Sequence, residues 1–140
     1  MVLVIHMDEK VNTLIKWILE SKRIVFFGGA GVSTESGLKD FRSKDGLYHE
    51  KYDYPPEEIL SHHFMIENSL EFYRFFRDNL VCSSYKPTLM HKVISALQEK
   101  GIVSGIITQN IDGLDTMAGS QVIELHGNAN RFYCMKCGKK

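Results

Sequence analysis

Hydrophobic and polar residues follow two different periods near the start of this chain. Between residues 8 and 22 apolar residues recur at the spacing of one helix face, with Lys and Glu between them: Val11, Leu14, Ile15, Ile18 and Leu19. This pattern predicts an amphipathic helix. The unbroken apolar run 24–27 is bounded by glycine and predicts a buried strand of a parallel sheet.

Further along, the pattern predicts alternating helices and strands. Residues 57–80 are rich in aromatics and predict helix, and residues 88–100 predict another helix, closed by Gly101. In that helix the expected apolar stripe consists of Leu89, Val93 and Leu97. The apolar stretches 102–108 and 121–125 predict two more buried strands. This order of elements predicts an α/β fold with a parallel sheet.

Composition narrows the class of protein. The chain has 140 residues, 44% hydrophobic and 24% charged, which suits one globular domain or a large piece of one. The 17 basic and 17 acidic residues balance, so we expect neither a sequence-specific nucleic-acid partner nor an anionic membrane. No apolar run is long enough to span a bilayer, and the apolar start is too short for a signal peptide. We therefore expect a cytoplasmic protein.

A glycine-rich turn follows the first predicted strand and carries the first candidate chemistry. The sequence is Gly28-Gly29-Ala30-Gly31-Val32-Ser33, and we expect it to lead into a helix. Glycines let backbone N–H groups approach a pyrophosphate, and a helix N-terminus adds positive potential. The third glycine of the usual dinucleotide fingerprint is missing from its normal place. A purely structural strand-to-helix turn is therefore an equal alternative.

The residues after this turn form a long loop, 38–56, of a kind that is often functional. Arg42 suits a phosphate, because guanidinium binds phosphate oxygens in pairs. Phe41 suits a role in covering a reactive ring and excluding water. A solvated loop with one buried Phe is the alternative.

Polar residues also follow the second and third predicted strands, where open α/β sheets bind ligands. The first group is Thr108-Gln109-Asn110-Ile111-Asp112-Gly113, and the second is Glu124-Leu125-His126-Gly127-Asn128. Amide and carboxyl side chains suit ribose hydroxyls and a carboxamide, although a capped turn has the same composition. His126 suits a general base near neutral pH, although a lone histidine is more often structural.

A Cys-x-x-Cys pair lies near the end of the chain. Cys134 and Cys137, followed by Gly138, have the spacing of one knuckle of a structural zinc site. Zinc needs four ligands, and Cys82 is a poor third because it lies in the helical region. An unmetallated pair is an equal alternative. An odd cysteine count with one such pair indicates metal or redox chemistry in a reducing compartment.

Together, in this order and at these spacings, the five motifs resemble the sirtuin family of NAD-dependent protein deacylases. The resemblance covers almost the whole chain but only about the first half of the family's catalytic domain. It implies an incomplete Rossmann-like parallel sheet with a small helical and zinc-ribbon module. Residues of about 43–85 would form the helical insertion, and residues of about 130–140 the start of the ribbon.

The resemblance also implies which residues bind NAD, a co-substrate that the reaction consumes. The implied NAD-site residues before the helical region are Gly29, Ala30, Gly31, Thr34, Asp40, Phe41 and Arg42. Gln109 and Asn110 would lie at the nicotinamide ribose, and Ile111 and Asp112 at the carboxamide. Asn110 and His126 would be catalytic, with His126 the base on a ribose hydroxyl.

The implied reaction removes an acyl group from lysine in protein substrates. Its products are nicotinamide, deacylated lysine and O-acetyl-ADP-ribose. The implied metal is a structural Zn²⁺ with Cys134 and Cys137 as two of its four ligands. Tyr73 is followed three residues later by Phe76, where sirtuins that prefer acidic acyl groups have Arg, so we expect an acetyl or other neutral acyl preference.

The chain departs from the family at a few positions. The family commonly has Thr at Gly28, Pro at Lys39 and His or a similar residue near Asp115, and we interpret these changes as affecting loop rigidity. The second Cys pair and the later strands are absent from the sequence. We therefore expect the isolated chain to fold poorly or associate, with little activity.

Two other functions fit parts of the pattern. A nicotinamide-dependent oxidoreductase needs an acidic residue about 20 residues after the glycine turn, at the end of the second strand. Here that position falls in residues 50–53, within the predicted loop. The other is a non-catalytic NAD-binding or zinc-binding module, which would need two more metal ligands.

Overall fold

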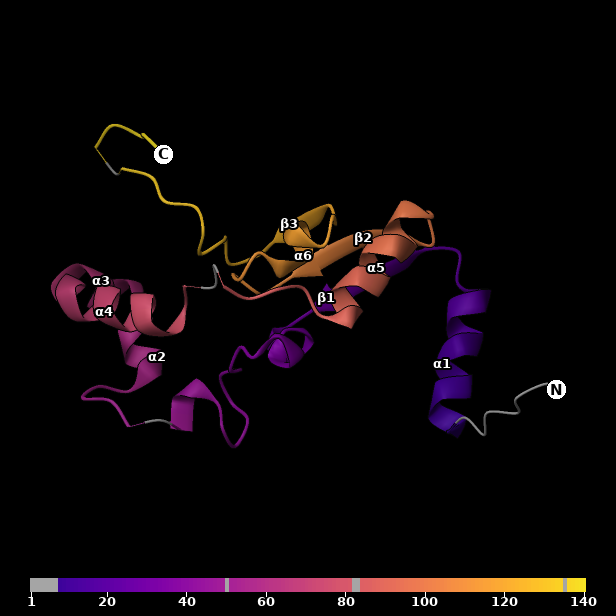
Figure 1. Ribbon diagram of the computed structural model, residues 1–140, viewed down its shortest axis with the longest axis horizontal. Helices are drawn as coiled ribbons and strands as arrows, with labels where there is room; N and C mark the ends of the chain where they lie inside the picture. The colour runs from indigo at the N-terminus through magenta and orange to yellow at the C-terminus, as the bar shows by residue number, and fades with distance from the viewer. Residues whose placement is uncertain (1–7, 50, 82–83, 135) are drawn as a thin grey trace.

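A three-stranded parallel sheet forms the centre of the computed structural model, which describes residues 8–49, 51–81, 84–134 and 136–140 (Figure 1). Its strands are β1 (Ile24–Gly28), β2 (Val103–Thr108) and β3 (Val122–Glu124), in that spatial order. The three predicted strands and their parallel pairing are confirmed. Gly28 pairs with Thr108 and Thr108 with Glu124, so all three strands end at one edge of the sheet.

Helix α5 (Leu89–Glu99) covers one face of the sheet. Ile94 packs there with Val103 and Ile106, and partly buried Leu97 joins this cluster. The predicted apolar stripe is wrong in two of its three members, since Leu89 and Val93 are exposed. The buried face instead begins with His91, which is 1% exposed. A hydrophobic pattern treats histidine as polar and so assigns the helix the wrong face.

Helix α1 (Glu9–Glu20) confirms the predicted amphipathic helix, and the Asp8 carboxylate caps it by accepting the Lys10 N–H at 3.0 Å. In Figure 1 this helix stands apart from the sheet. None of its residues is buried by the described part of the chain. On β1, Val25 and Phe27 are each 58% exposed, so they also lie on an uncovered surface.

A second hydrophobic core lies in a small helical module beside the sheet (Figure 1). Its helices are α2 (Pro56–Ile59), α3 (His62–Glu67) and α4 (Ser69–Asn79), which confirms the helical prediction for residues 57–80. The core consists of five buried residues: Leu47, Ile59, Phe64, Phe75 and Leu80. Phe41 and Ile111 pack against it from loops that leave the sheet. The module therefore contacts two loops that the sequence assigns to the NAD site.

The remaining helices are short. They are the 3-10 turns η1 (Ala30–Val32), η2 (Thr34–Ser36) and η3 (Leu47–His49), and the helix α6 (Leu114–Met117). Among the described residues, no helix has both the length and the apolar character needed to cross a membrane.

The uncovered apolar surface on β1 leads to a first testable prediction. Contiguous exposed apolar surface favours association, so we expect the chain to associate as its concentration rises. Phe27→Lys adds a charge to this surface and is expected to reduce the weight-average molar mass measured by sedimentation. Leu70→Lys, at an exposed position of α4, is the matched control and is expected to behave like the unaltered chain. A chain that stays monomeric up to about 100 µM, a concentration at which an interface of micromolar Kd is saturated, would contradict the prediction.

Candidate functional site

The loops after the three strands meet at the edge where the strands end. The Gln109 N–H donates to the Gly28 carbonyl at 3.0 Å, and the Leu125 N–H donates to the Thr108 carbonyl at 3.0 Å. Asn110 Nδ2 donates to the Gly29 carbonyl at 3.1 Å. The glycine turn, the 109–113 loop and the start of the 125–131 loop are therefore joined by direct hydrogen bonds.

The glycine turn does not lead into the α-helix that the sequence predicts. It continues as η1 and η2, each three residues long, and η2 ends at Gly37 with φ of +91°. Ser33 lies between the two turns and is 2% exposed, because its side chain points into the interior. Two short 3-10 turns therefore take the place of the continuous helix that the sequence predicts.

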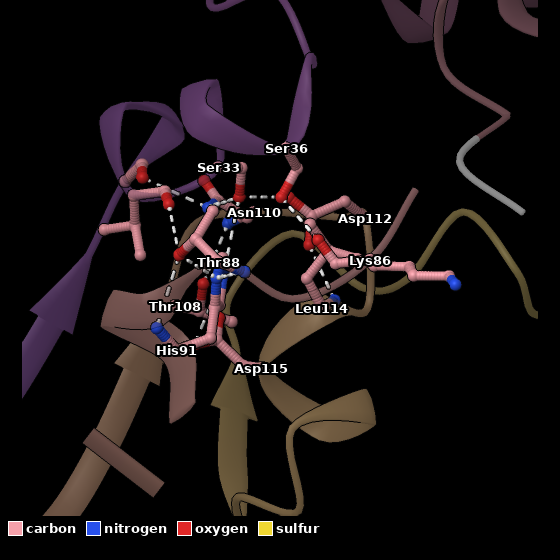
Figure 2. Close-up of polar contacts among 12 residues, drawn as sticks. Ser33, Ser36, Lys86, Thr88, His91, Thr108, Asn110, Asp112, Leu114 and Asp115 are labelled. Atoms are coloured by element: carbon pink, nitrogen blue, oxygen red, sulfur yellow. Dashed lines mark hydrogen bonds and ion pairs between the residues drawn. The ribbon is translucent and has the colours of Figure 1, made fainter. Parts of the chain in front are cut away.

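Ser33 is the centre of a buried polar network at this edge (Figure 2). Its Oγ–H donates to Asp112 Oδ2 at 2.7 Å, and its Oγ accepts from Asn110 Nδ2 at 3.1 Å. These partners lie 79 and 77 positions away in the sequence. Asn110 Nδ2 thus donates to both Gly29 and Ser33, which fixes the orientation of its amide.

Asp112 lies two residues before the start of α6 and is 6% exposed. Its Oδ1 accepts the Leu114 N–H at 2.8 Å, while Oδ2 accepts Ser33. Gly113 follows with φ of +75°, a left-handed conformation that favours glycine. A Cβ there would also lie 3.1 Å from Asn130 Nδ2, so the turn leaves little room for a side chain.

Thr88 and His91 complete the network from the start of α5, and our sequence reasoning missed both. The Thr88 N–H donates to His91 Nδ1 at 3.1 Å in a capping box, while the Thr88 hydroxyl donates to the Val32 carbonyl at 3.1 Å. Thr88 Oγ1 also lies 2.7 Å from His91 Nδ1, so Thr88 fixes the orientation of the His91 ring at that nitrogen. The sequence signal was Thr88-x-x-His91 directly before an apolar run, the spacing of a capping box.

Asp115 lies in the same network and is 4% exposed. Its Oδ1 is 4.0 Å from His91 Nε2, and its carboxylate interacts with the Thr108 side chain. Burial raises the pKa of Asp115 above its usual range, although interactions with the Thr108 side chain and with His91 oppose this shift. Asp112 and Glu124 add smaller upward effects. The Asp115 side chain is therefore part of the buried network.

This raised pKa leads to a prediction for stability. The folded chain holds the Asp115 proton to higher pH than the unfolded chain, so this proton adds to the free energy of unfolding. The added stability is fully present below the usual carboxyl range. It is lost as pH rises through the raised pKa of Asp115, at up to about 1.4 kcal/mol per pH unit. Urea unfolding over a pH series should show this fall in the unaltered chain relative to Asp115→Asn. A difference between the two that does not change with pH would contradict the prediction.

The 40–47 loop is built around Asp40 and Gly46. Asp40 Oδ1 accepts the Ser43 N–H at 3.1 Å, and the Leu47 N–H donates to the Asp40 carbonyl at 2.9 Å. Phe41 is partly buried against the helical module, whereas the Arg42 side chain is exposed. The loop therefore holds Phe41 in place and leaves Arg42 at the surface.

Two further NAD-site candidates lie in the glycine turn. Thr34 is exposed, and its Oγ1–H donates to the Gly31 carbonyl at 3.0 Å. Ala30 is partly buried in η1. Thr34 and Ala30 therefore lie beside the glycines that the sequence predicts to bind a pyrophosphate.

His126 lies just beyond β3 and is exposed. The loop that carries it is tied to the 111–113 loop, because the Ala129 N–H donates to the Ile111 carbonyl at 2.7 Å. Asn130 Nδ2 also donates to the Asp112 carbonyl at 3.1 Å. Glu124 accepts Asn128 Nδ2 at 2.7 Å and pairs with Arg131. The structure thus places the candidate base on a loop fixed to the Asp112 loop.

Cys134 and Cys137 lie in a tight turn at the end of the chain, and both are exposed free thiols. The Cys134 N–H donates to the Lys139 carbonyl and the Gly138 N–H to the Cys134 carbonyl, both at 2.8 Å. Backbone N–H groups of Cys137 and Lys136 lower the pKa of Cys134, which favours the thiolate that binds metal. The pair fits half of a zinc site. No group of three or more metal-ligating residues occurs among the described residues, and Cys82 lies outside them.

The 50–53 segment tests the oxidoreductase alternative. Lys51, Tyr52 and Asp53 lie in irregular structure and not at the end of a strand, and Glu50 lies outside the described residues. Strand β2 instead leads into Gln109 and Asn110. Among the described residues of this segment, no acidic residue therefore lies at the end of a strand, where such an enzyme needs one.

Comparison with known proteins decides the family. The model of the Sir2 family matches residues 29–140. The chain belongs to the Sir2 family. It is 49% identical over 134 residues to a protein of Clostridium acetobutylicum named NAD-dependent protein deacetylase, which covers 94% of this chain and 55% of that protein. A Cutibacterium acnes protein of the same name is 52% identical over 129 residues, covering 90% and 53%. The chain spans about half the length of these curated relatives.

Solved Sir2 structures share the fold. A Sir2 variant with a deacetylated peptide and 3′-O-acetyl ADP ribose superposes with a TM-score of 0.84 at 39% identity, covering 92% of this chain and 52% of that one. A Sir2 complex with a peptide and NAD⁺ gives a TM-score of 0.78 at 38% identity, covering 95% and 51%. The predicted family and the predicted Rossmann-like α/β fold are therefore confirmed.

Proposed function

We propose that this Sir2-family chain provides the nicotinamide-ribose half of an NAD-dependent protein-lysine deacetylase site. The observation that carries the proposal is the buried network that fixes Asn110 and Asp112 through Ser33 at the edge where the strands end. Relatives named NAD-dependent protein deacetylase, at 49% identity, support the same reaction. The reaction moves an acyl group from a lysine side chain to ADP-ribose and releases nicotinamide.

In this proposal the 109–112 loop recognises the nicotinamide end of NAD. Each Asp112 oxygen accepts one hydrogen bond in the structure, and a carboxylate oxygen has capacity for a second. Asp112 and the Ile111 backbone are therefore assigned to the carboxamide of nicotinamide. Gln109 and Asn110 are assigned to the adjacent ribose.

The remaining NAD contacts are assigned to the glycine turn and the 40–47 loop. They are Gly29, Ala30, Gly31, Thr34, Asp40, Phe41 and Arg42. The exposed guanidinium of Arg42 suits a phosphate, and Phe41 is held in place by the helical module.

His126 is assigned as the general base that takes a proton from a ribose hydroxyl. Histidine suits this role because its ordinary pKa lies near neutrality. The His126 loop is hydrogen-bonded to the Asp112 loop, which keeps the base beside the nicotinamide half of the site.

NAD titration followed by NMR tests the proposal. We expect the amide resonances of Gln109, Asn110 and Asp112 to shift on addition of NAD, and nicotinamide to be released only slowly when an acetyl-lysine peptide is added, because the chain provides half of the site. His126→Ala is expected to keep the NAD-induced shifts and to lose formation of the deacetylated peptide, which requires the ribose hydroxyl to give up its proton. Absence of both NAD shifts and nicotinamide would overturn the proposal. Faster turnover of succinyl-lysine than of acetyl-lysine would overturn the proposed neutral acyl preference.

We also propose that Cys134 and Cys137 supply two of the four ligands of a structural Zn²⁺. The tight turn and the lowered pKa of Cys134 support this assignment. Their free thiols also agree with our proposal of a reducing, cytoplasmic location. Zinc measured per chain should fall in Cys134→Ser, and an unchanged content would overturn the metal assignment.

A further inference from the structure

Asp115 is the buried carboxylate directly beneath the loop that the proposed function assigns to nicotinamide. It belongs to the first turn of α6, which follows Gly113, and its side chain points toward Thr108 and His91 (Figure 2). None of the roles proposed for NAD recognition uses it. A carboxylate that is 4% exposed needs a compensating role, because burial penalises its charge.

One route from Asp115 reaches Asn110 through Thr108. The Asn110 N–H donates to Thr108 Oγ1 at 3.2 Å, so Oγ1 is an acceptor in that bond. The Thr108 hydroxyl proton is then free to point at the Asp115 carboxylate, with which the Thr108 side chain interacts. The hydroxyl that holds the backbone of Asn110 is thus one that also interacts with Asp115.

A second route reaches Asp112 through His91 and Ser33. With Nδ1 held by Thr88, His91 Nε2 faces Asp115 Oδ1 at 4.0 Å and Ser33 Oγ at 3.5 Å. Ser33 in turn donates its hydroxyl proton to Asp112 at 2.7 Å. His91 therefore lies between Asp115 and the Ser33 hydroxyl that binds Asp112.

We propose that Asp115 is a positioning residue, whose carboxylate orients Asn110 through Thr108 and orients Asp112 through His91 and Ser33. The effect of this role on NAD recognition rests on the proposed function, whereas the two routes themselves do not. Asp115 does not touch NAD in this arrangement and acts only through these neighbours.

The charges around Asp115 make this role measurable. The other carboxylates that face it are Asp112, which is held by Ser33 and the Leu114 N–H, and Glu124, which pairs with Arg131. His91 is the imidazole that faces it. Burial and the two carboxylates raise the pKa of Asp115, so it changes charge at a pH where exposed carboxylates are already ionised.

An NMR titration of the labelled 140-residue chain tests the positioning role without NAD. We expect the side-chain carboxyl carbon of Asp115 and the backbone amide of Asn110 to titrate with one shared midpoint above the ordinary carboxyl range. Asp115→Asn should abolish this step at Asn110, while Asp53→Asn, at an exposed carboxylate, should leave it unchanged. Different midpoints for the two nuclei in the unaltered chain would overturn the proposal. That comparison decides the matter even where Asp115→Asn does not fold.

NAD titration of the same variants separates this inference from the proposed function. We expect Asp115→Asn to weaken NAD binding about tenfold and Asp53→Asn to leave it unchanged, since one misplaced hydrogen-bonding group costs roughly this factor. Unchanged NAD affinity in a folded Asp115→Asn chain would overturn the positioning role. An unaltered chain that binds no NAD would overturn the proposed function instead, and the shared midpoint would still decide the role of Asp115.

Discussion

Replacing Asp112 with alanine is expected to abolish detectable NAD binding and to lower the free energy of unfolding by about 3 kcal/mol. The carboxylate accepts the Ser33 hydroxyl and the Leu114 N–H, and both donors are buried. Truncation leaves each donor without its acceptor, and an unsatisfied buried donor costs about 1–3 kcal/mol. The same change removes the group assigned to the nicotinamide carboxamide.

Two measurements check this prediction. Titration calorimetry measures NAD affinity, and urea unfolding measures stability. Asp53→Ala, at an exposed carboxylate outside the 40–47 loop, is the matched control and should change neither quantity. Asp112→Asn keeps an acceptor for one donor, so its loss of stability should be smaller while NAD binding is still weakened. An Asp112→Ala chain that is as stable as the control would contradict the hydrogen-bond argument.

The edge of the sheet that holds the site is predictable from sequence because of a geometric rule. Parallel strands end at a common edge, so polar residues that follow successive apolar runs must converge there. Asn110 and Asp112 follow β2, Gly29 follows β1, and hydrogen bonds join them as this rule requires. The register Gly28–Thr108–Glu124 confirms the shared edge.

The buried polar residues next to that edge, His91 and Asp115, are not predictable from sequence in the same way. His91 and Asp115 are polar residues in positions that a hydrophobic pattern reserves for apolar ones, and both are nearly inaccessible. Their burial is tolerated because Thr88, Ser33 and Thr108 supply donors and acceptors. These partners lie up to 58 positions from His91, a separation that no local pattern reports.

Helix α1 shows a different limit. Its periodicity predicts a helix correctly, and the structure contains that helix. The same periodicity also predicts a buried face, yet Leu14 and Ile18 remain exposed to the described part of the chain. An amphipathic pattern reports that a face suits burial and does not report which segment covers it.

Gly46→Ala is expected to destabilise the chain by about 3 kcal/mol and to weaken NAD binding through the 40–47 loop. A Cβ at this position would lie 2.8 Å from the backbone carbonyl carbon and oxygen of Phe41. Backbone atoms cannot rotate away as a side chain can, so the loop itself must move. That movement breaks the hydrogen bonds from Leu47 N–H to Asp40 and from Tyr48 N–H to Phe41, at 2.9 and 3.0 Å.

The consequence reaches the site because this loop joins two parts of the molecule. Phe41 and Leu47 both pack in the helical module, and Phe41 is also assigned to the NAD site. Gly105→Ala is the matched control, since a Cβ on that β2 glycine meets no atom within 4 Å. Urea unfolding should show a large loss for Gly46→Ala and little change for Gly105→Ala. Equal stability of the two variants would mean that the close approach of Gly46 to Phe41 does not hold the loop, and the assignment of Phe41 to a fixed NAD-site position would lose its structural support.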